Sequence, residues 1–278
     1  MNLIKYKVAE IIKSNYDPKL THNEVGATIS HLGIKKANTR VWQLLLLGLL
    51  AGLYISFGSH LFLVALEQGM SRIIAGACFS VGLVLVVIAG AELFTGNITM
   101  VVGAITGLYS PFALLKNWIV VYIGNMAGAM LTAYLVYRSG IFGHGQELST
   151  IGNMAVKIAD YKMELTFSEA FIRGILCNIL VILAIIMSYF SKDVISKIVC
   201  VVLPIMAFVA SGFEHSIANM YLIPAGFLTK GFTFSQQFLM FHNILPVTLG
   251  NIVGGLFITL IHPNRMRQIA TLFSGRKR

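Results

Sequence analysis

The chain contains six long apolar runs, and they limit its fold more than any other feature. They lie near residues 41–66, 71–107, 112–137, 167–190, 195–226 and 237–262. Each has the roughly 20 residues that a helix needs to cross a hydrocarbon core about 30 Å thick. Because 56% of the residues are apolar and only 12% are charged, the chain lacks the polar surface of a soluble globule. An all-α integral membrane protein with six transmembrane helices is predicted.

The second and fifth runs are too long for one helix, and each contains a short polar stretch. These stretches are GAELFTGN at residues 90–97 and GFEHSIAN at residues 212–219. Unsatisfied backbone groups in lipid are costly, so a helix breaks at this depth only where protein or water surrounds the break. We therefore expect helices 2 and 5 to be interrupted beside a cavity or channel.

The two polar stretches resemble each other. Aligning Glu92 with Glu214 matches the pattern Gly-x-Glu-x4-Asn in both, at an offset of 122 residues. A second pattern, Asn-x6-Gly-Asn-x2-Gly, begins at Asn117 and again at Asn243, at an offset of 126. A duplication explains both matches, and because each repeat holds three spans, the second copy is inverted in the bilayer. The sequence predicts an inverted 3+3 repeat with its substrate path where the broken helices meet.

Basic residues indicate which side each end of the chain faces. With the N-terminus placed inside, the inner segments carry fifteen lysines and arginines and the outer segments five. Both termini are therefore expected on the cytoplasmic side of the cell inner membrane. The net charge of +10 lies mainly in tails and loops, which makes membrane lipid a simpler partner than nucleic acid.

We expect the chain to be divided into three segments. Residues 1–40 are predicted to be a cytoplasmic amphipathic segment, because Ile4 and Val8 begin an apolar series at helical spacing. A helix docking on the protein itself is the alternative. Residues 41–262 are expected to form the six-helix transmembrane domain, and residues 263–278 a basic cytoplasmic tail.

Four polar residues recur at matching places in the breaks and are expected to have a structural role. They are Glu92, Glu214, Asn97 and Asn219. We expect the carboxylates to accept backbone N–H bonds at the exposed half-helix N-termini and so hold the breaks open. Cation binding is the alternative, and the basic residues in the loops at the pore entrance argue against it.

His215 has no counterpart in the first repeat, because Leu93 stands at its repeat position. Charging an imidazole at membrane depth costs a few kcal/mol, so a histidine there is normally neutral, partnered and functional. A packing histidine bonded to a neighbouring helix is the alternative. Beside a helix break, we favour a functional role.

Other classes of protein fit the sequence less well. The three cysteines stand apart in apolar runs, so no disulfide, metal site or cofactor is expected. A hydrolase would need a nucleophile and base, but Ser216 and His215 are sequence neighbours that rarely orient as a dyad, so an enzyme is not expected. A water or glycerol pore shares the architecture, yet the Asn-Pro-Ala turns expected of it do not occur in the sequence.

Several stretches resemble the signature regions of the formate/nitrite transporter family, which includes formate, nitrite and hydrosulfide channels. They are GAELFTGN, CVVLPIMAFVAS leading into GFEHSIANM, and LPVTLGNIVGG, and the resemblance covers about residues 30–262. It implies an aquaporin-like fold, a homopentamer with lipid at its centre, and one pore through each subunit. The implied substrates are small monovalent anions together with protons. Formate is the first choice, with nitrite, hydrosulfide, acetate and lactate as alternatives.

The resemblance also implies roles for individual residues. His215 matches the central pore histidine, and Lys162, counted in the outer loop, matches a lysine that draws anions into the outer vestibule. The movable loop that breaks the second helix corresponds to Leu93, Phe94 and Thr95. The implied constriction residues are Leu83 and Phe79 on the inner side and Phe208 on the outer side. The residues implied to hydrogen-bond near the centre are Asn178 and Asn251.

A proton-assisted passage is expected from these roles. A bare anion that enters an apolar constriction loses its hydration, at a cost on the order of 20 kcal/mol in the low-dielectric limit. A proton that reaches the anion through the site of His215 would let it pass as a neutral weak acid. In the alternative, a neutral histidine only hydrogen-bonds an anion that moves through.

Overall fold

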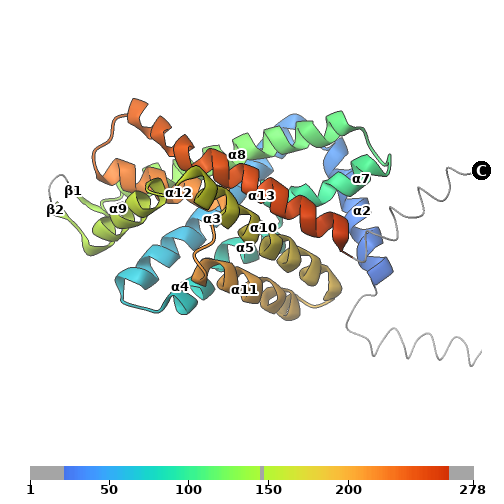
Figure 1. Cartoon of the computed structure of the whole chain (residues 1–278), viewed down its shortest axis with the longest axis horizontal. Coiled ribbons are helices and arrows are strands. Elements are labelled where there is room, and N and C mark those ends of the chain that lie inside the picture. The colour runs from blue at the N-terminus through green and yellow to red at the C-terminus, as the bar shows by residue number, and fades with distance from the viewer. Residues whose placement is uncertain (1–21, 145–146, 263–278) are drawn as a thin grey trace, which may run out of the picture.

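The computed structural model describes residues 22–144 and 147–262, which are almost entirely helical (Figure 1). The amphipathic series that begins at Ile4 and the basic tail lie outside the described residues. The long unbroken helices are α3 (Val41–Glu67), α8 (Pro111–Arg138), α10 (Phe167–Phe190) and α13 (Phe241–Ile261). An all-helical fold rich in apolar helices confirms the coarser part of the predicted class.

Shorter elements lie at the ends of the bundle. Helix α2 (His22–Asn38) precedes α3, and a two-stranded hairpin of β1 (Gly143–His144) and β2 (Glu147–Leu148) leads into α9 (Thr150–Met163). The 3-10 helix η3 (Ser235–Met240) leads into α13. Figure 1 shows α2 and α9 at opposite ends of the molecule.

The second apolar run folds as a series of short helices around a non-helical segment. Before the break come α4 (Arg72–Phe79), α5 (Val81–Leu85) and the π-helix η1 (Val86–Gly90). After residues 91–93 come α6 (Phe94–Asn97), η2 (Ile98–Met100) and α7 (Val101–Ile105). Gly90 ends the first half with a φ of +81°, a conformation that glycine adopts without steric cost.

The fifth run is divided in the same way. Helix α11 (Val194–Ala210) ends at a turn in which Gly212 has a φ of +73°, and α12 (Ser216–Thr229) begins after His215. Helix α11 has 17 residues and α12 has 14, so both halves are shorter than the roughly 20 residues typical of a transmembrane helix. For this reason five helical stretches of the described chain, and not six, have the length and apolarity of a membrane span: Val41–Glu67, Arg72–Gly90, Pro111–Arg138, Phe167–Phe190 and Ser235–Ile261.

Glycines allow two pairs of long helices to pack closely. Helix α3 presents Gly52 to α8, and helix α10 presents Gly174 to α13. At Gly128 of α8, an added Cβ would collide with the carbonyl oxygen of Leu49. Small residues are the common means of close helix contact in membranes, where lipid is as apolar as the side chains.

Replacing Gly128 with alanine is expected to destabilise the fold by about 1–3 kcal/mol, the usual cost of overpacking a close contact. The thermal unfolding midpoint in detergent should fall. The volume-conserving change Ile119→Leu, at an exposed position on the same helix, is the control and should leave the midpoint unchanged. An unchanged midpoint for Gly128→Ala would show that α3 and α8 are not held at this distance.

Candidate functional site

Two cavities approach the helix breaks from opposite ends of the bundle. The first, here called the α9 cavity, has a volume of about 160 Å³ and is lined by Lys162, His215 and Phe208 among others. The second, the α2 cavity, has a volume of about 720 Å³ and is lined by Lys36 and Glu92 among others. The breaks therefore lie between the two cavities.

A direct hydrogen bond joins the two breaks. Thr95 Oγ1, in the first turn of α6, lies 2.9 Å from His215 Nε2, and both residues are buried. The backbone N–H of Ala218 donates to His215 Nδ1 at 3.2 Å, so that nitrogen must be an acceptor. The neutral tautomer with its proton on Nε2 satisfies both contacts, and His215 then donates to Thr95.

Apolar side chains surround this hydrogen bond. The Phe208 ring stacks on the His215 ring with centroids 6.0 Å apart, and Phe79 packs edge-on against Phe208 at 5.7 Å. Both phenylalanines line the α9 cavity, whereas Leu83 and Leu93 line the α2 cavity. The centre is therefore enclosed by apolar groups on both sides.

The position of Phe79 corrects one expectation. The resemblance placed Phe79 with Leu83 at the inner constriction, but Phe79 lies with Phe208 on the other side of the centre. Residues four apart share a helix face yet lie about 6 Å apart along the axis, so one can face each cavity.

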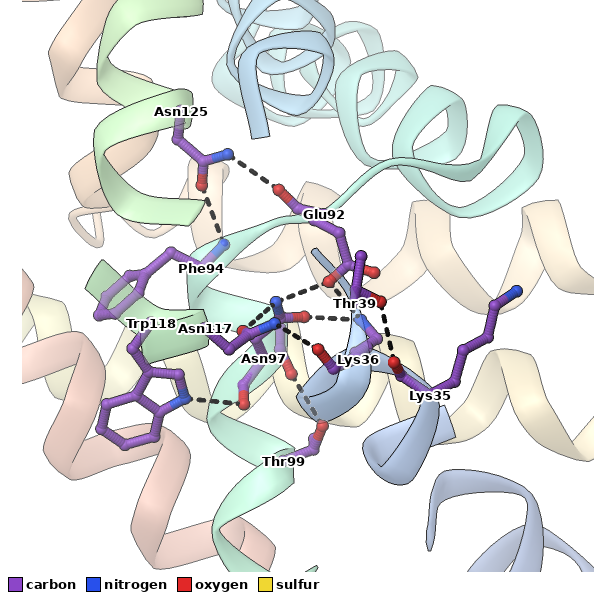
Figure 2. A network of polar contacts seen from close by, with 11 residues as sticks. Lys35, Lys36, Thr39, Glu92, Phe94, Asn97, Thr99, Asn117, Trp118 and Asn125 are labelled. Atoms are coloured by element: carbon purple, nitrogen blue, oxygen red, sulfur yellow. Dashed lines mark hydrogen bonds and ion pairs between the residues drawn. The ribbon is translucent and has the colours of Figure 1, made fainter. Parts of the chain in front are cut away.

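Asn125 satisfies the backbone of the first break (Figure 2). Its Oδ1 accepts the N–H of Phe94 at 2.9 Å. Its Nδ2 donates to the carbonyl oxygens of Gly48 at 2.8 Å and Glu92 at 2.9 Å. One amide from α8 thus pairs with three backbone groups, two of which belong to the interrupted segment itself.

Asn251 does the same at the second break. Its Oδ1 accepts the N–H of Ser216 at 2.9 Å, and its Nδ2 donates to the carbonyl oxygens of Gly174 at 2.8 Å and Glu214 at 3.0 Å. The carbonyl oxygen of Asn251 also accepts a bond from Asn178 Nδ2 at 2.7 Å. Both predicted asparagines therefore lie near the centre, and Asn251 supports the break directly.

A buried ion pair lies beside the second break. Lys162 Nζ contacts both carboxylate oxygens of Glu214, at 3.0 and 2.8 Å. Asn219 Nδ2 donates to the same carboxylate at 2.6 Å and to Asn243 Oδ1 at 2.7 Å. The Asn243 amide closes the network by donating to the Lys162 carbonyl oxygen at 2.8 Å.

Lys162 therefore differs from the expected loop residue. It belongs to the last turn of α9 and is 8% exposed. The segment before α10 is too polar to be recognised as a span, but it forms a helix that packs against α12. This packing carries Lys162 inward to Glu214.

The first break has the matching network (Figure 2). Lys36 Nζ, from α2, lies 3.0 Å from the Glu92 carboxylate and donates to Asn97 Oδ1 at 2.6 Å. Asn97 Nδ2 donates to Glu92 at 2.7 Å and to Asn117 Oδ1 at 2.8 Å. The carboxylates thus accept side-chain bonds, where we had expected backbone N–H bonds, because the asparagines of α8 and α13 already occupy the backbone groups.

Aromatic side chains fix the start of α6. Phe94 is buried and packs edge-on against Trp118 at 6.1 Å and Tyr122 at 5.0 Å between ring centroids. Trp118 Nε1 donates to the carbonyl oxygen of Asn97 at 3.0 Å. Phe94 therefore anchors the segment that carries Leu93 and Thr95.

The comparisons with known proteins agree with this geometry. The model of the formate/nitrite transporter family matches residues 23–263. The chain belongs to the formate/nitrite transporter family. It is 38% identical over 248 residues to the formate channel FocA of Escherichia coli strain K12, covering 80% of this chain and 86% of that protein. It is also 38% identical over 248 residues to a probable formate transporter of Methanothermobacter thermautotrophicus, covering 82% and 90%.

Solved structures of the family have the same fold. A pentameric formate channel with formate bound matches with a TM-score of 0.68 at 33% identity, covering 79% of this chain and 95% of that one. An ion channel of the FNT family matches with a TM-score of 0.73 at 26% identity, covering 91% and 98%. The expected family membership is confirmed.

Sequence reasoning missed several parts of the site: Lys36, Trp118, Asn117, Asn125 and Asn243. For Lys36 a signal was present, because the offset of 126 that relates Asn117 to Asn243 also relates Lys36 to Lys162.

In residues 22–144 and 147–262, no three histidine, cysteine or carboxylate side chains come together as metal ligands.

Replacing Lys162 with methionine is expected to destabilise the protein by about 3–5 kcal/mol, because Glu214 would keep a buried charge without a partner. Adding Glu214→Gln should restore much of the loss. Thermal unfolding in detergent measures both changes.

The matched control is Lys230→Met. Lys230 pairs with Asp160, but the two side chains are 33% and 42% exposed, so this change should cost less than about 1 kcal/mol. Equal losses for the two lysine variants would contradict a structural role for the buried pair.

Proposed function

We propose that the chain is a transmembrane channel for small monovalent anions of weak acids, most simply formate. The observation that carries the proposal is the hydrogen bond between Thr95 and His215, which joins the two broken helices at a point between two cavities. The relatives named as formate channels support formate as the substrate. Nitrite and hydrosulfide are the alternatives within the same family.

The proposed architecture is aquaporin-like, with six spans in an inverted 3+3 repeat. Its support is the correspondence of the two breaks: Asn125 and Asn251 make the same three kinds of bond, and Lys36–Glu92 corresponds to Lys162–Glu214. The likeness to a pentameric channel supports a homopentamer with one path in each subunit. The excess of basic residues on the α2 side supports a cytoplasmic α2 cavity and an external α9 cavity.

The proposed path has a polar entrance at each end and an apolar centre. In the α9 cavity, Lys162 and the N-terminus of α12 stabilise an anion close to the break. Beyond them, Phe208 and Phe79 offer no hydrogen bonds to replace lost hydration. The free energy of desolvation therefore opposes passage of the anion, and the protonated, neutral acid crosses with a much lower free-energy cost.

His215 is proposed to act as a hydrogen-bond donor to the passing particle. With Nδ1 occupied by the Ala218 N–H, the ring has one proton to offer, on Nε2. Giving that proton away would leave an imidazolate unless Nδ1 gained a proton and lost its bond to Ala218. We therefore propose that water in the cavity supplies the proton, while His215 and Thr95 orient the acid as it crosses.

Uptake by proteoliposomes is the direct test of the proposed function. Formate, nitrite and hydrosulfide are to be compared across pH, with glycerol as a neutral solute. We expect saturable uptake of at least one anion that becomes faster as external pH falls, and no enhanced glycerol flux. Glycerol flux with no anion uptake would contradict an anion channel.

Replacing His215 with phenylalanine should strongly alter the pH dependence of uptake, because an anion that the central donor no longer holds is not protonated by water in the cavity, and only acid already protonated in bulk solution then passes. His60→Phe is the matched control. His60 bonds Tyr221 at 2.8 Å and lies outside both cavities, so this variant should keep the wild-type pH profile. An unchanged profile in His215→Phe would reduce His215 to a packing residue.

A further inference from the structure

The buried lysine of the α9 cavity is poorly suited to attract anions from a distance. Lys162 contacts both oxygens of Glu214, and the two side chains are only 10% and 2% exposed. A positive and a negative charge this close act on a distant ion only as a dipole, whose field falls off faster than that of a single charge. Long-range attraction must come from other residues.

Two further cations line the same cavity. Arg72 is the first residue of α4, and Lys157 lies in α9, five residues before Lys162. Both side chains are exposed, and within the described part of the chain neither forms a salt bridge. Their charges are therefore not cancelled by a close carboxylate.

The position of Arg72 brings its charge to the edge of the second break. One guanidinium nitrogen lies 3.6 Å from the point where a Cβ on Gly212 would be. Gly212 forms the turn that leads to Glu214 and His215. An anion drawn to Arg72 would thus arrive beside the segment that leads to the centre.

Three carboxylates near the cavity are already engaged, and two more, Glu67 at the end of α3 and Glu164 at the end of α9, are not among its lining residues. Glu214 is held by Lys162, and Asp160 pairs with Lys230 at 2.6 Å. Glu169 accepts the N–H and hydroxyl of Thr166 in a capping box at the start of α10. The residues that line the cavity include three cations and one carboxylate, so its field favours anions.

We propose that Arg72 and Lys157 are the anion-capture residues of the α9 cavity, and that Lys162 acts beyond them as a local hydrogen-bond donor. This inference rests on the proposed function, because it concerns entry into the same path. The captured class is any small monovalent anion, since exposed point charges select by charge and not by shape.

Ionic strength separates these two roles in transport. Exposed charges act over a Debye length of about 10 Å at 0.1 M salt and about 3 Å at 1 M. The double variant Arg72→Gln, Lys157→Gln should therefore raise the apparent KM for formate at low salt, by about twofold for each charge acting over roughly 10 Å of water. The difference should vanish at 1 M salt, and the maximal rate should not change.

Two variants control for this measurement. Arg138→Gln removes a charge from an exposed residue at the end of α8 that is outside both cavities, and it should leave KM unchanged. Arg72→Lys keeps the charge and should have the wild-type KM at low salt. A KM increase that is equal at low and high salt, or equal in Arg138→Gln, would overturn the capture role.

A cysteine thiol placed in the cavity reports the electrostatic potential of the cavity, and the measurement does not require transport. Leu66 is a half-buried lining residue, and Leu66→Cys can be reacted with an anionic and a cationic methanethiosulfonate reagent of similar size. We expect the ratio of anionic to cationic rates to fall several-fold when Arg72 and Lys157 are both neutralised. The parent chain gives the background from Cys78 and Cys200, which are half-buried.

The two measurements fail independently. If the rate ratio of the Leu66→Cys variant does not change on neutralising Arg72 and Lys157, the capture role is overturned even if formate is transported. If the wild type transports none of the three anions, the proposed function fails, while the thiol reaction still decides whether Arg72 and Lys157 attract anions into the cavity.

Discussion

Everything in this protein depends on satisfying backbone groups where two helices break inside an apolar bundle. Each unpaired N–H or carbonyl in such surroundings costs several kcal/mol, and a break frees several of them at once. Asn125 and Asn251 meet this requirement with one side-chain amide each, reaching across from α8 and α13. Because the breaks are stable, Thr95 and His215 can meet at the centre.

Charged groups near the breaks are likewise paired. Glu92 and Glu214 each lie beside a break with a lysine and an asparagine as partners, so neither leaves an uncompensated charge near the path. Closely paired charges hold segments together, whereas exposed unpaired cations act at a distance. This division of roles leaves the centre uncharged, with a neutral histidine between phenylalanine and leucine side chains. The proposed passage of a neutral acid rests on this uncharged centre.

The polar residues at the two breaks could be predicted from the sequence, because Gly, Glu and Asn recur at fixed spacing in both stretches. Prediction was weaker wherever a partner comes from a distant element. In the sequence Lys36 resembles the other lysines of the N-terminal segment, and only the packing of α2 against the first break brings it to Glu92. Lys162 was assigned to a loop because α9 has little apolar character. The side on which Phe79 lies depends on its depth along α4, which helical periodicity does not encode. The aromatic anchor of Phe94 is a contact between helices, and no local pattern indicates it.

Neutral passage past His215 is tested most directly by measuring charge and protons together during formate uptake into proteoliposomes. The membrane potential is to be set with potassium and valinomycin, and internal pH followed with an enclosed dye. We expect one proton to enter with each formate and the rate to be independent of the potential. Formate uptake that follows the potential and leaves internal pH unchanged would contradict passage as a neutral acid.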